Sequence, residues 1–270
     1  MQARHGTEKN QFAAKNAFKA LLLIGAGWLA GPGVALAEEG SKSFVDDFST
    51  FERSRWYVSD GWSNGNHQNC TWSSNQVKVA DNKLTLSFEK RPYKDREYSC
   101  SEIQTTQRFG YGIYEARFKT DTGSGLNAAF FTYIGPQSGQ PHDEIDFEAL
   151  TKDTSKIEVN TYVDGKPHHG SKIDVAGGTD GKFNDYAIVW EPEQIRWYVN
   201  GQLVHTASGP TLPSHPQKIF FSFWGTDTLN DWMGAFTDPG RRVVFEIDQI
   251  SFTELGEECQ FPESVACNLQ

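Results

Sequence analysis

Short runs of alternating apolar and polar residues, separated by Gly, Asn, Asp and Pro, dominate the sequence from Val77 onward. Leu84, Leu86 and Phe88, for example, are each separated by one polar residue. A period of two is typical of β-strands, because successive side chains point to opposite faces of a sheet. No window sustains the spacing of an amphipathic helix over three turns. The pattern predicts an all-β fold, a β-sandwich of two packed antiparallel curved sheets of the jelly-roll kind.

The expected strands follow one another at intervals that turn residues punctuate. They are 112–119, 128–133, 144–150, 157–163, 186–190, 195–199, 218–224 and 242–252. Asn200-Gly201 predicts a tight hairpin turn between two strands. Before this series, we expect an entry strand within 41–56 and a long polar loop at 59–69. Trp190 and Trp197 lie in alternating apolar runs and are assigned to the core.

The first 37 residues differ in composition from the remainder. They begin with basic residues, continue with an uncharged stretch and end in the small-residue sequence Ala35-Leu36-Ala37. This order is typical of a secretory signal peptide, and the stretch is interrupted by glycines and a proline that make a membrane anchor the weaker interpretation. We therefore expect residues 1–37 to be removed, residues 38–270 to form a single domain, and the protein to be secreted, outside the cell or into the periplasm.

The mature chain is strongly acidic. Of the 25 basic and 35 acidic residues, four basic and one acidic lie in the predicted signal, which leaves 21 against 34 and a formal net charge of −13. Such a charge disfavours nucleic acid and anionic membranes as partners. We expect no membrane association after signal cleavage, and a monomer.

All four cysteines lie in the mature chain. An even number in an oxidising compartment is typical of disulfides, and we expect Cys70 to pair with Cys100 and Cys259 with Cys267. Cysteine spacing alone does not prove connectivity. A metal site is the alternative, although the spacings match no zinc pattern.

A row of acidic residues lies in the expected strand 144–150. The period of two places Glu144, Asp146 and Glu148 on one face, and Ile145 and Phe147 on the other. Like charges on one face repel, so the arrangement is costly unless the acids act together. In a flat strand the Cα atoms of Glu144 and Glu148 are about 13 Å apart.

On a curved sheet the two long side chains can lean together. A carboxyl separation of about 5 to 5.5 Å is the geometry of a retaining glycosidase, in which one carboxylate attacks the sugar and the other serves as acid and base. Asp146 between them can raise the pKa of the carboxyl that must stay protonated. From the alternation alone, an ordinary solvated strand and a cation site remain open alternatives.

The run from Asp143 to Glu148 resembles the signature of glycoside hydrolase family 16, in the form found in bacterial lichenases. The resemblance extends over nearly the whole mature chain. Its further motifs are Ser63-Asn64-Gly65-Asn66, Asn69-Cys70-Thr71-Trp72, Gly110-Tyr111-Gly112 with Tyr114-Glu115, 130–136, 197–201 and Asp231-Trp232-Met233-Gly234. The resemblance implies a concanavalin A-like jelly roll and a secreted endo-β-glycanase that needs no catalytic cofactor and acts on a polysaccharide.

The family pattern also implies roles for single residues. Glu144 is the expected nucleophile, Glu148 the general acid/base and Asp146 their assistant. Sugar contacts are implied for Asn64, Glu102, Phe131, Tyr133, Asn160, Tyr162, Trp224 and Trp232. Flat aromatic faces suit the apolar faces of sugars, and Asn and Glu suit hydroxyl groups. Asp248 matches a position where the family often binds a structural Ca²⁺, and an unoccupied solvated Asp is the alternative.

Three positions depart from the lichenase pattern. His142 replaces a Trp, Gln104 an Arg and Ser222 an Asn. His142 is a candidate sugar ligand, without a catalytic role. The departures around an intact acidic trio point to a different glycan, and the pattern is similar to the rhizobial branch of the family, which depolymerises succinoglycan. We expect an enzyme that cleaves β-1,4 and β-1,3 linked glucose polysaccharide; a lichenase, a transglycosylase and a non-catalytic glycan-binding sandwich are the alternatives.

Overall fold

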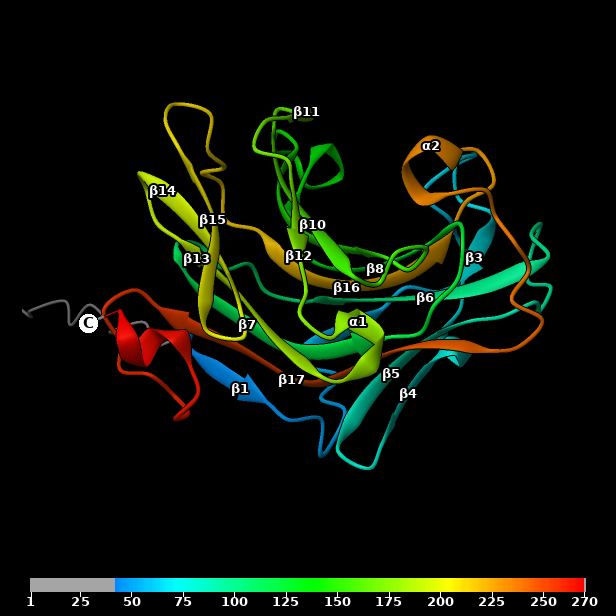
Figure 1. Ribbon diagram of the computed structural model, residues 1–270, viewed down its shortest axis with the longest axis horizontal. Coiled ribbons are helices and arrows are strands. Elements are labelled where there is room, and N and C mark those ends of the chain that lie inside the picture. Colours follow the sequence, from blue (N-terminus) through cyan, green and yellow to red (C-terminus); the bar gives the residue numbers. More distant parts are fainter. Residues whose placement is uncertain (1–41, 270) are drawn as a thin grey trace, which may run out of the picture. The chain divides into compact units, whose positions relative to one another are not determined.

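The computed structural model describes residues 42–269. The predicted signal peptide, residues 1–37, lies outside the described residues. The described chain forms two β-sheets that lie face to face as two layers (Figure 1). The expected all-β sandwich is confirmed.

The first sheet contains eight strands; most of them form the lower part of Figure 1, and the edge made by residues 184–208 rises at the left of the view. Their order is β15 (Gln202–Ser208), β14 (Gln194–Val199), β13 (Asn184–Trp190), β7 (Gly112–Thr120), β17 (Val243–Glu254), β5 (Lys83–Phe88) and β4 (Val77–Ala80), with β1 (Phe44–Asp46) paired to β17. All of these pairings are antiparallel.

The second sheet contains nine strands. Their order is β11 (Lys166–Pro167), β10 (Lys156–Val163), β9 (Asp143–Leu150), β8 (Leu126–Ile134), β16 (Lys218–Gly225), β6 (Tyr98–Thr105) and β2 (Trp56–Val58), with β12 (Ser171–Asp174) beside β10 and β3 (Cys70–Trp72) beside β6. The β3–β6 pair is parallel, which departs from the expected antiparallel pattern.

Helices in the described chain are single turns. They are α1 (Gly178–Gly181), α2 (Asn230–Met233) and the 3-10 turns η1 (Ser74–Gln76), η2 (Pro136–Ser138) and η3 (Val265–Asn268). In Figure 1, α2 and the turn between β10 and β11 lie above β16, on the side away from β17. Among residues 42–269, no helix has the length and apolar character needed to cross a membrane.

Aromatic side chains from both sheets fill the space between the layers. Phe118 stacks on Tyr186 at 3.9 Å between ring centroids, and Phe130 stacks on Phe221 at 5.1 Å. Trp190 and Trp197 are fully buried, so their assignment to the core is confirmed. The Trp197 indole also donates a hydrogen bond of 3.0 Å to the backbone carbonyl of Asp146, which ties the first sheet to β9.

The expected strands are all present, within one or two residues of their predicted bounds. Asn200 and Gly201 have φ angles of 49° and 75°, as the predicted hairpin turn requires. The expected entry strand is wrong in its extent, because only the short strand β1 forms within it and β2 begins at its last residue, Trp56. Asp46 turns the chain between them by accepting hydrogen bonds from the Phe48 amide at 3.0 Å and the Trp56 indole at 2.8 Å.

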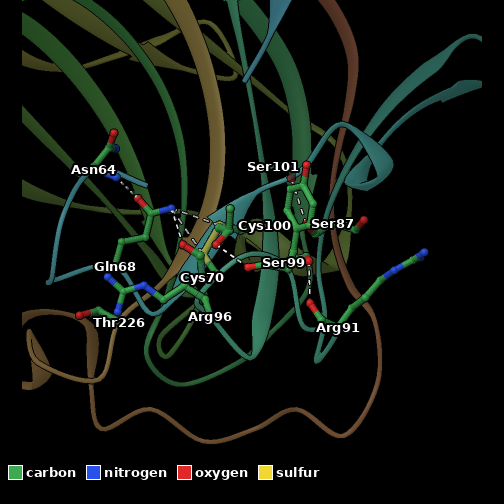
Figure 2. Close-up of a disulfide and its surroundings, with 12 residues drawn as sticks. Asn64, Gln68, Cys70, Ser87, Arg91, Arg96, Ser99, Cys100, Ser101 and Thr226 are labelled. Atoms are coloured by element: carbon green, nitrogen blue, oxygen red, sulfur yellow. Dashed lines mark hydrogen bonds between the residues drawn. A yellow bond between two sulfur atoms is a disulfide. The ribbon is translucent and has the colours of Figure 1, made fainter. Parts of the chain in front are cut away.

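The cysteines form two disulfides, Cys70–Cys100 and Cys259–Cys267. Figure 2 shows the first, which joins the parallel strands β3 and β6. Gln68 lies beside it and donates a hydrogen bond of 3.0 Å to the Cys70 carbonyl. The same side chain accepts a hydrogen bond of 3.0 Å from the Asn64 amide. The disulfide therefore anchors the polar loop that carries Asn64.

The two disulfides are expected to differ in their contribution to stability. They span 30 and 8 residues of sequence, and the chain entropy that a cross-link removes from the unfolded state grows with loop length. Replacing both cysteines of the longer loop by serine is expected to lower the free energy of unfolding by about 3–4 kcal/mol, against about 2–3 kcal/mol for the shorter one. Denaturant titration of the two double variants measures this order, and equal or inverted losses contradict it.

Candidate active site

Strand β9 separates its side chains between the core and the open face of the nine-stranded sheet. Ile145 and Phe147 are fully buried in the core. Glu144, Asp146 and Glu148 alternate with them and point to the opposite face, as the period of two predicts. Glu144 and Glu148 are half-buried and line a cavity, whereas Asp146 is buried.

The neighbouring strands place a partner on each side of every acid. Read from β8 through β9 to β10, the three rows are Tyr133, Glu144 and Tyr162; Phe131, Asp146 and Asn160; and Ala129, Glu148 and Glu158. The small side chain of Ala129 leaves space beside Glu148. The acids thus lie in the middle of a face with aromatic and polar residues on both sides.

Two cavities meet at Glu148. One of about 600 Å³ is lined mainly by β6, β8 and β16, and includes Asn64, Glu102, Phe131, Tyr133, His142 and Trp224 together with Glu144. Another of about 350 Å³ is lined by β10 and α2, and includes Asn160, Tyr162 and Trp232. Every residue for which a sugar contact is predicted therefore borders one of the two cavities. The contacts themselves stay a prediction.

Glu148 is arranged as a proton donor. Burial, and after it the charge of Glu144, raise the pKa of its carboxyl to about 8. A hydrogen bond of 3.0 Å from the Asn127 side-chain amide opposes this shift, while the charge of Glu158 adds to it. The carboxyl is therefore protonated at neutral pH and can give its proton to a group in either cavity.

Asp146 lies between the two glutamates. Burial raises the pKa of its carboxyl well above the usual value, and the charges of Glu144 and Glu148 and a hydrogen bond with Glu144 raise it further. A neutral Asp146 separates the glutamates without adding a third negative charge. This fits the predicted role of an assistant to both.

Glu144 has a partner that the sequence did not predict. Its Oε2 lies 2.6 Å from Nε2 of His142, which precedes it by two residues. His142 was expected to be a sugar ligand, and it does line the larger cavity. Its ring is also in direct contact with the carboxylate of Glu144.

A polar contact between α2 and β10 holds the wall of the smaller cavity. The Trp232 indole of α2 donates a hydrogen bond of 3.0 Å to Glu158 of β10, and Lys172 of β12 approaches the same carboxylate at 2.9 Å. Trp224 of β16 lies 6.3 Å from Trp232 between ring centroids. Two aromatic faces suitable for sugar rings thus flank Glu148.

Glu102 is the least exposed of the predicted sugar ligands. Burial raises the pKa of its carboxyl to about 7, and the Ser59 hydroxyl donates a hydrogen bond of 2.5 Å to it. The side chain borders the larger cavity. It is already engaged on one oxygen, which leaves the other for a hydroxyl group.

Several residues of the site were missed from the sequence. Asn127 lies on the same face of β8 as Phe131 and Tyr133, and Glu158 lies on the same face of β10 as Asn160. The alternation that identified their neighbours could have found both. Lys218 and Phe220, which share a face of β16 with Trp224 and line the larger cavity, follow the same rule.

Asp248 was expected to bind Ca²⁺ together with backbone carbonyls, and its side chain lies beside a guanidinium group. It lies at an irregularity in β17, and its Oδ2 is 3.2 Å from Nε of Arg117. A guanidinium beside the carboxylate does not fit a Ca²⁺ ligand. Within residues 42–269, no cluster of three His, Cys, Asp or Glu side chains is placed to hold a metal ion. Ca²⁺ at Asp248 therefore stays a prediction that would require Arg117 to move.

Substitutions of two neighbours of Glu148 are expected to shift its pKa in opposite directions. Asn127→Ala removes the hydrogen bond that lowers this pKa, so we expect it to rise. Glu158→Gln removes a negative charge that raises it, so we expect it to fall. Carbon-13 NMR titration of the glutamate carboxyls measures both, with Glu148→Gln to assign the signal. Shifts of the same sign would contradict this arrangement of charges.

Comparison with known proteins agrees with the geometry. The sequence model of glycosyl hydrolases family 16 matches residues 64–243. Endo-1,3-1,4-beta-glycanase ExoK of Rhizobium meliloti (strain 1021) is 56% identical over 232 residues, which cover 85% of each chain. The beta-glucanase of Bacillus subtilis (strain 168) is 38% identical over 203 residues, which cover 75% of this chain and 82% of the relative.

Solved structures give the same result. The Bacillus licheniformis beta-glucanase superposes with a TM-score of 0.76 at 33% identity, covering 80% of this chain and 100% of that one. A beta-1,3-1,4-glucanase (lichenase) derived from a mouse hindgut metagenome gives 0.75 at 33% identity, covering 79% and 99%. Sequence, fold and the acidic face of β9 lead to one conclusion: this chain belongs to glycosyl hydrolases family 16.

Proposed function

We propose that this chain is a secreted, retaining endo-β-glycanase that hydrolyses glucose polysaccharide with β-1,3 and β-1,4 linkages, and that its substrate is the bacterial exopolysaccharide succinoglycan. The observation that carries the proposal is the pair of glutamates on one face of β9. Glu148 is held protonated, and Glu144 lies beside it facing the same groove. A catalytically silent glycan-binding sandwich would need neither of them.

The first step transfers the sugar to the enzyme. The Glu144 carboxylate attacks the anomeric carbon while Glu148 gives its proton to the glycosidic oxygen, and the electron pair of the broken bond stays on that oxygen. The aromatic rings of Trp224 and Trp232 hold the sugar units beside Glu148. Asp146, whose pKa is raised, lies between the two glutamates and when protonated adds no negative charge beside the Glu144 carboxylate.

The second step releases the sugar. Glu148, now ionised, takes a proton from water, the water oxygen attacks the anomeric carbon, and the bond to Glu144 breaks with its electron pair returning to the carboxylate. Two displacements at one carbon restore its original configuration. The protein thus needs no cofactor for the reaction.

The choice of substrate is supported by the groove residues that depart from the lichenase pattern. Gln104, His142 and Ser222 all line the larger cavity, and the first of these accepts a hydrogen bond of 2.9 Å from Lys218. The catalytic acids are unchanged. The similarity to the rhizobial endo-1,3-1,4-beta-glycanase points in the same direction.

Glutamine substitutions test the site. We expect Glu144→Gln and Glu148→Gln each to lower kcat/KM by about a thousandfold or more, because each removes a group that changes bonding in the transition state. Glu193 is an exposed acid that lines neither of the two cavities. Glu193→Gln is therefore the matched control and is expected to retain activity. NMR of the first product should show the β-anomer, and an α-anomer would exclude the retaining mechanism.

The substrate is tested by ranking polymers. Succinoglycan is expected to be cleaved faster than lichenan, laminarin and carboxymethylcellulose, as measured by release of reducing ends from equal masses of polymer. A preference for lichenan would assign a lichenase instead. Secretion is tested by N-terminal sequencing of the protein from the culture medium or periplasm, which is expected to begin at Glu38.

A further inference from the structure

His142 makes a direct polar contact with the proposed nucleophile. Its Nε2 lies 2.6 Å from Glu144 Oε2, a short distance for a hydrogen bond between a nitrogen and a carboxylate oxygen. His142 immediately precedes β9 and is two positions before Glu144, so a continued extended backbone directs both side chains to the same side. Both are part-buried, with 31% and 19% of the side chain exposed, so water screens the contact only partly.

Three elements hold the imidazole ring in this position. The ring stacks on Tyr162 of β10, with 5.3 Å between centroids and an angle of 17°, and meets the edge of Tyr133 of β8 at 5.0 Å. These two tyrosines occupy the register positions on either side of Glu144. The His142 carbonyl also accepts a hydrogen bond of 3.0 Å from the Gly165 amide. The contact with Glu144 thus belongs to a packed arrangement.

Glycine at position 165 suits the turn that lies beside the ring. Its φ angle is +72°, a backbone conformation that residues other than glycine rarely adopt. A Cβ there would lie 3.5 Å from His142 Nδ1. The β10–β11 turn therefore approaches the ring closely, on the side of Nδ1, and leaves Nε2 directed at Glu144.

We propose that His142 is a positioning residue for the nucleophile, which holds one oxygen of Glu144 in place and whose charge state sets how readily the other oxygen attacks the substrate. The proposal rests on the proposed function, in which Glu144 is the nucleophile. It goes further by assigning control of the first step to a residue outside the acidic trio.

A neutral imidazole and an imidazolium act differently on the first step. A neutral ring donates its Nε2 proton to Glu144 and orients the carboxylate. A charged ring forms an ion pair, which stabilises the carboxylate before the reaction and is lost as Glu144 bonds to the anomeric carbon. Protonation of His142 is therefore expected to slow the formation of the glycosyl-enzyme.

The second step responds in the opposite sense. When water attacks the anomeric carbon, the electron pair of the bond to Glu144 returns to the carboxylate. An imidazolium stabilises the negative charge that reappears there. The charge of His142 thus shifts the balance between the two steps, a property that the Trp of the lichenase pattern at this position cannot supply.

The groups around the ring leave Glu144 as its main ionic partner. Tyr133 and Tyr162 face it from β8 and β10, and burial raises both of their pKa values, that of Tyr162 to about 12, so both are neutral in the assay range. Asp143 of β9 acts on the ring through its charge, but accepts hydrogen bonds from the His215 side chain at 2.8 Å and the Ser214 amide at 3.1 Å. The hydrogen bond with Glu144 raises the pKa of His142, and burial opposes it.

The test compares two substitutions of His142. Gln can place an amide near the position of Nε2, so His142→Gln keeps a hydrogen-bond donor but has no group that titrates. His142→Phe keeps a flat ring but has neither a donor nor a titrating group. The dependence of kcat/KM on pH is measured on a soluble β-glucan oligosaccharide that the wild type cleaves. Wild type is expected to lose activity on its acidic side in parallel with protonation of His142, as followed by NMR of the imidazole.

The fall of kcat/KM on the acidic side of the pH profile is called the acidic limb. We expect His142→Gln to move this limb to lower pH, while kcat/KM at the optimum pH stays within about tenfold of wild type. His142→Phe is expected to move the limb in the same way and to lower kcat/KM by about tenfold or more, since the lost hydrogen bond is one to a charged group. His215→Asn, which alters the other histidine near Asp143, is the matched control and is expected to leave the limb in place. An acidic limb that stays unchanged in His142→Gln overturns the proposal.

An NMR measurement tests the contact between His142 and Glu144 without relying on enzyme activity. In Glu144→Gln the carboxylate that raises the pKa of His142 is absent, so this pKa is expected to fall relative to wild type. An unchanged pKa of His142 in this variant shows that the two side chains are not coupled. It overturns the proposal even if the wild type is an active glycanase. If the wild type hydrolyses none of the β-glucans, the proposed function fails, while the NMR result still decides whether the contact exists.

Discussion

Crowding of acidic side chains on one face of β9 is the constraint on which the rest of the site depends. Like charges at this spacing repel, and the sheet tolerates them for two reasons. The opposite face of the strand is locked into the core by Ile145 and Phe147, and the Trp197 indole bonds the backbone at Asp146 from the other sheet. Protons on Asp146 and Glu148 then remove part of the charge, because burial raises the pKa of each. Burial, together with repulsion from Glu144, thus keeps a proton on Glu148 that is available for transfer.

The fold and the faces of its strands could be predicted from the sequence because they depend on local alternation. The acidic trio, the Asn200-Gly201 turn and the burial of Trp190 and Trp197 follow from spacing or from a short turn signal. The same alternation places Asn127 on the face of Phe131 and Glu158 on the face of Asn160, so both could have been predicted as site residues.

Other features depend on contacts between distant segments and could not be predicted. The parallel pairing of β3 with β6 joins strands that are separated by two others in the sequence. The register that places Tyr133 and Tyr162 beside Glu144 depends on how β8 and β10 pair with β9, which alternation alone does not determine. The Asp248–Arg117 contact, which does not fit the expected Ca²⁺ ligand, joins β17 to β7. His142 and Glu144 are close in sequence, but the orientation of the imidazole depends on packing from two other strands.

The meeting of two cavities at Glu148 has a consequence for how a polymer is shortened. Because sugar units can lie on both sides of the acid, the bond that breaks lies inside a bound stretch of chain, with residues held before and after it. Cuts then fall throughout the polymer and not at its ends. A solution of long chains would lose its viscosity after a small fraction of the bonds had been broken, so that a gel or capsule softens well before many free ends accumulate.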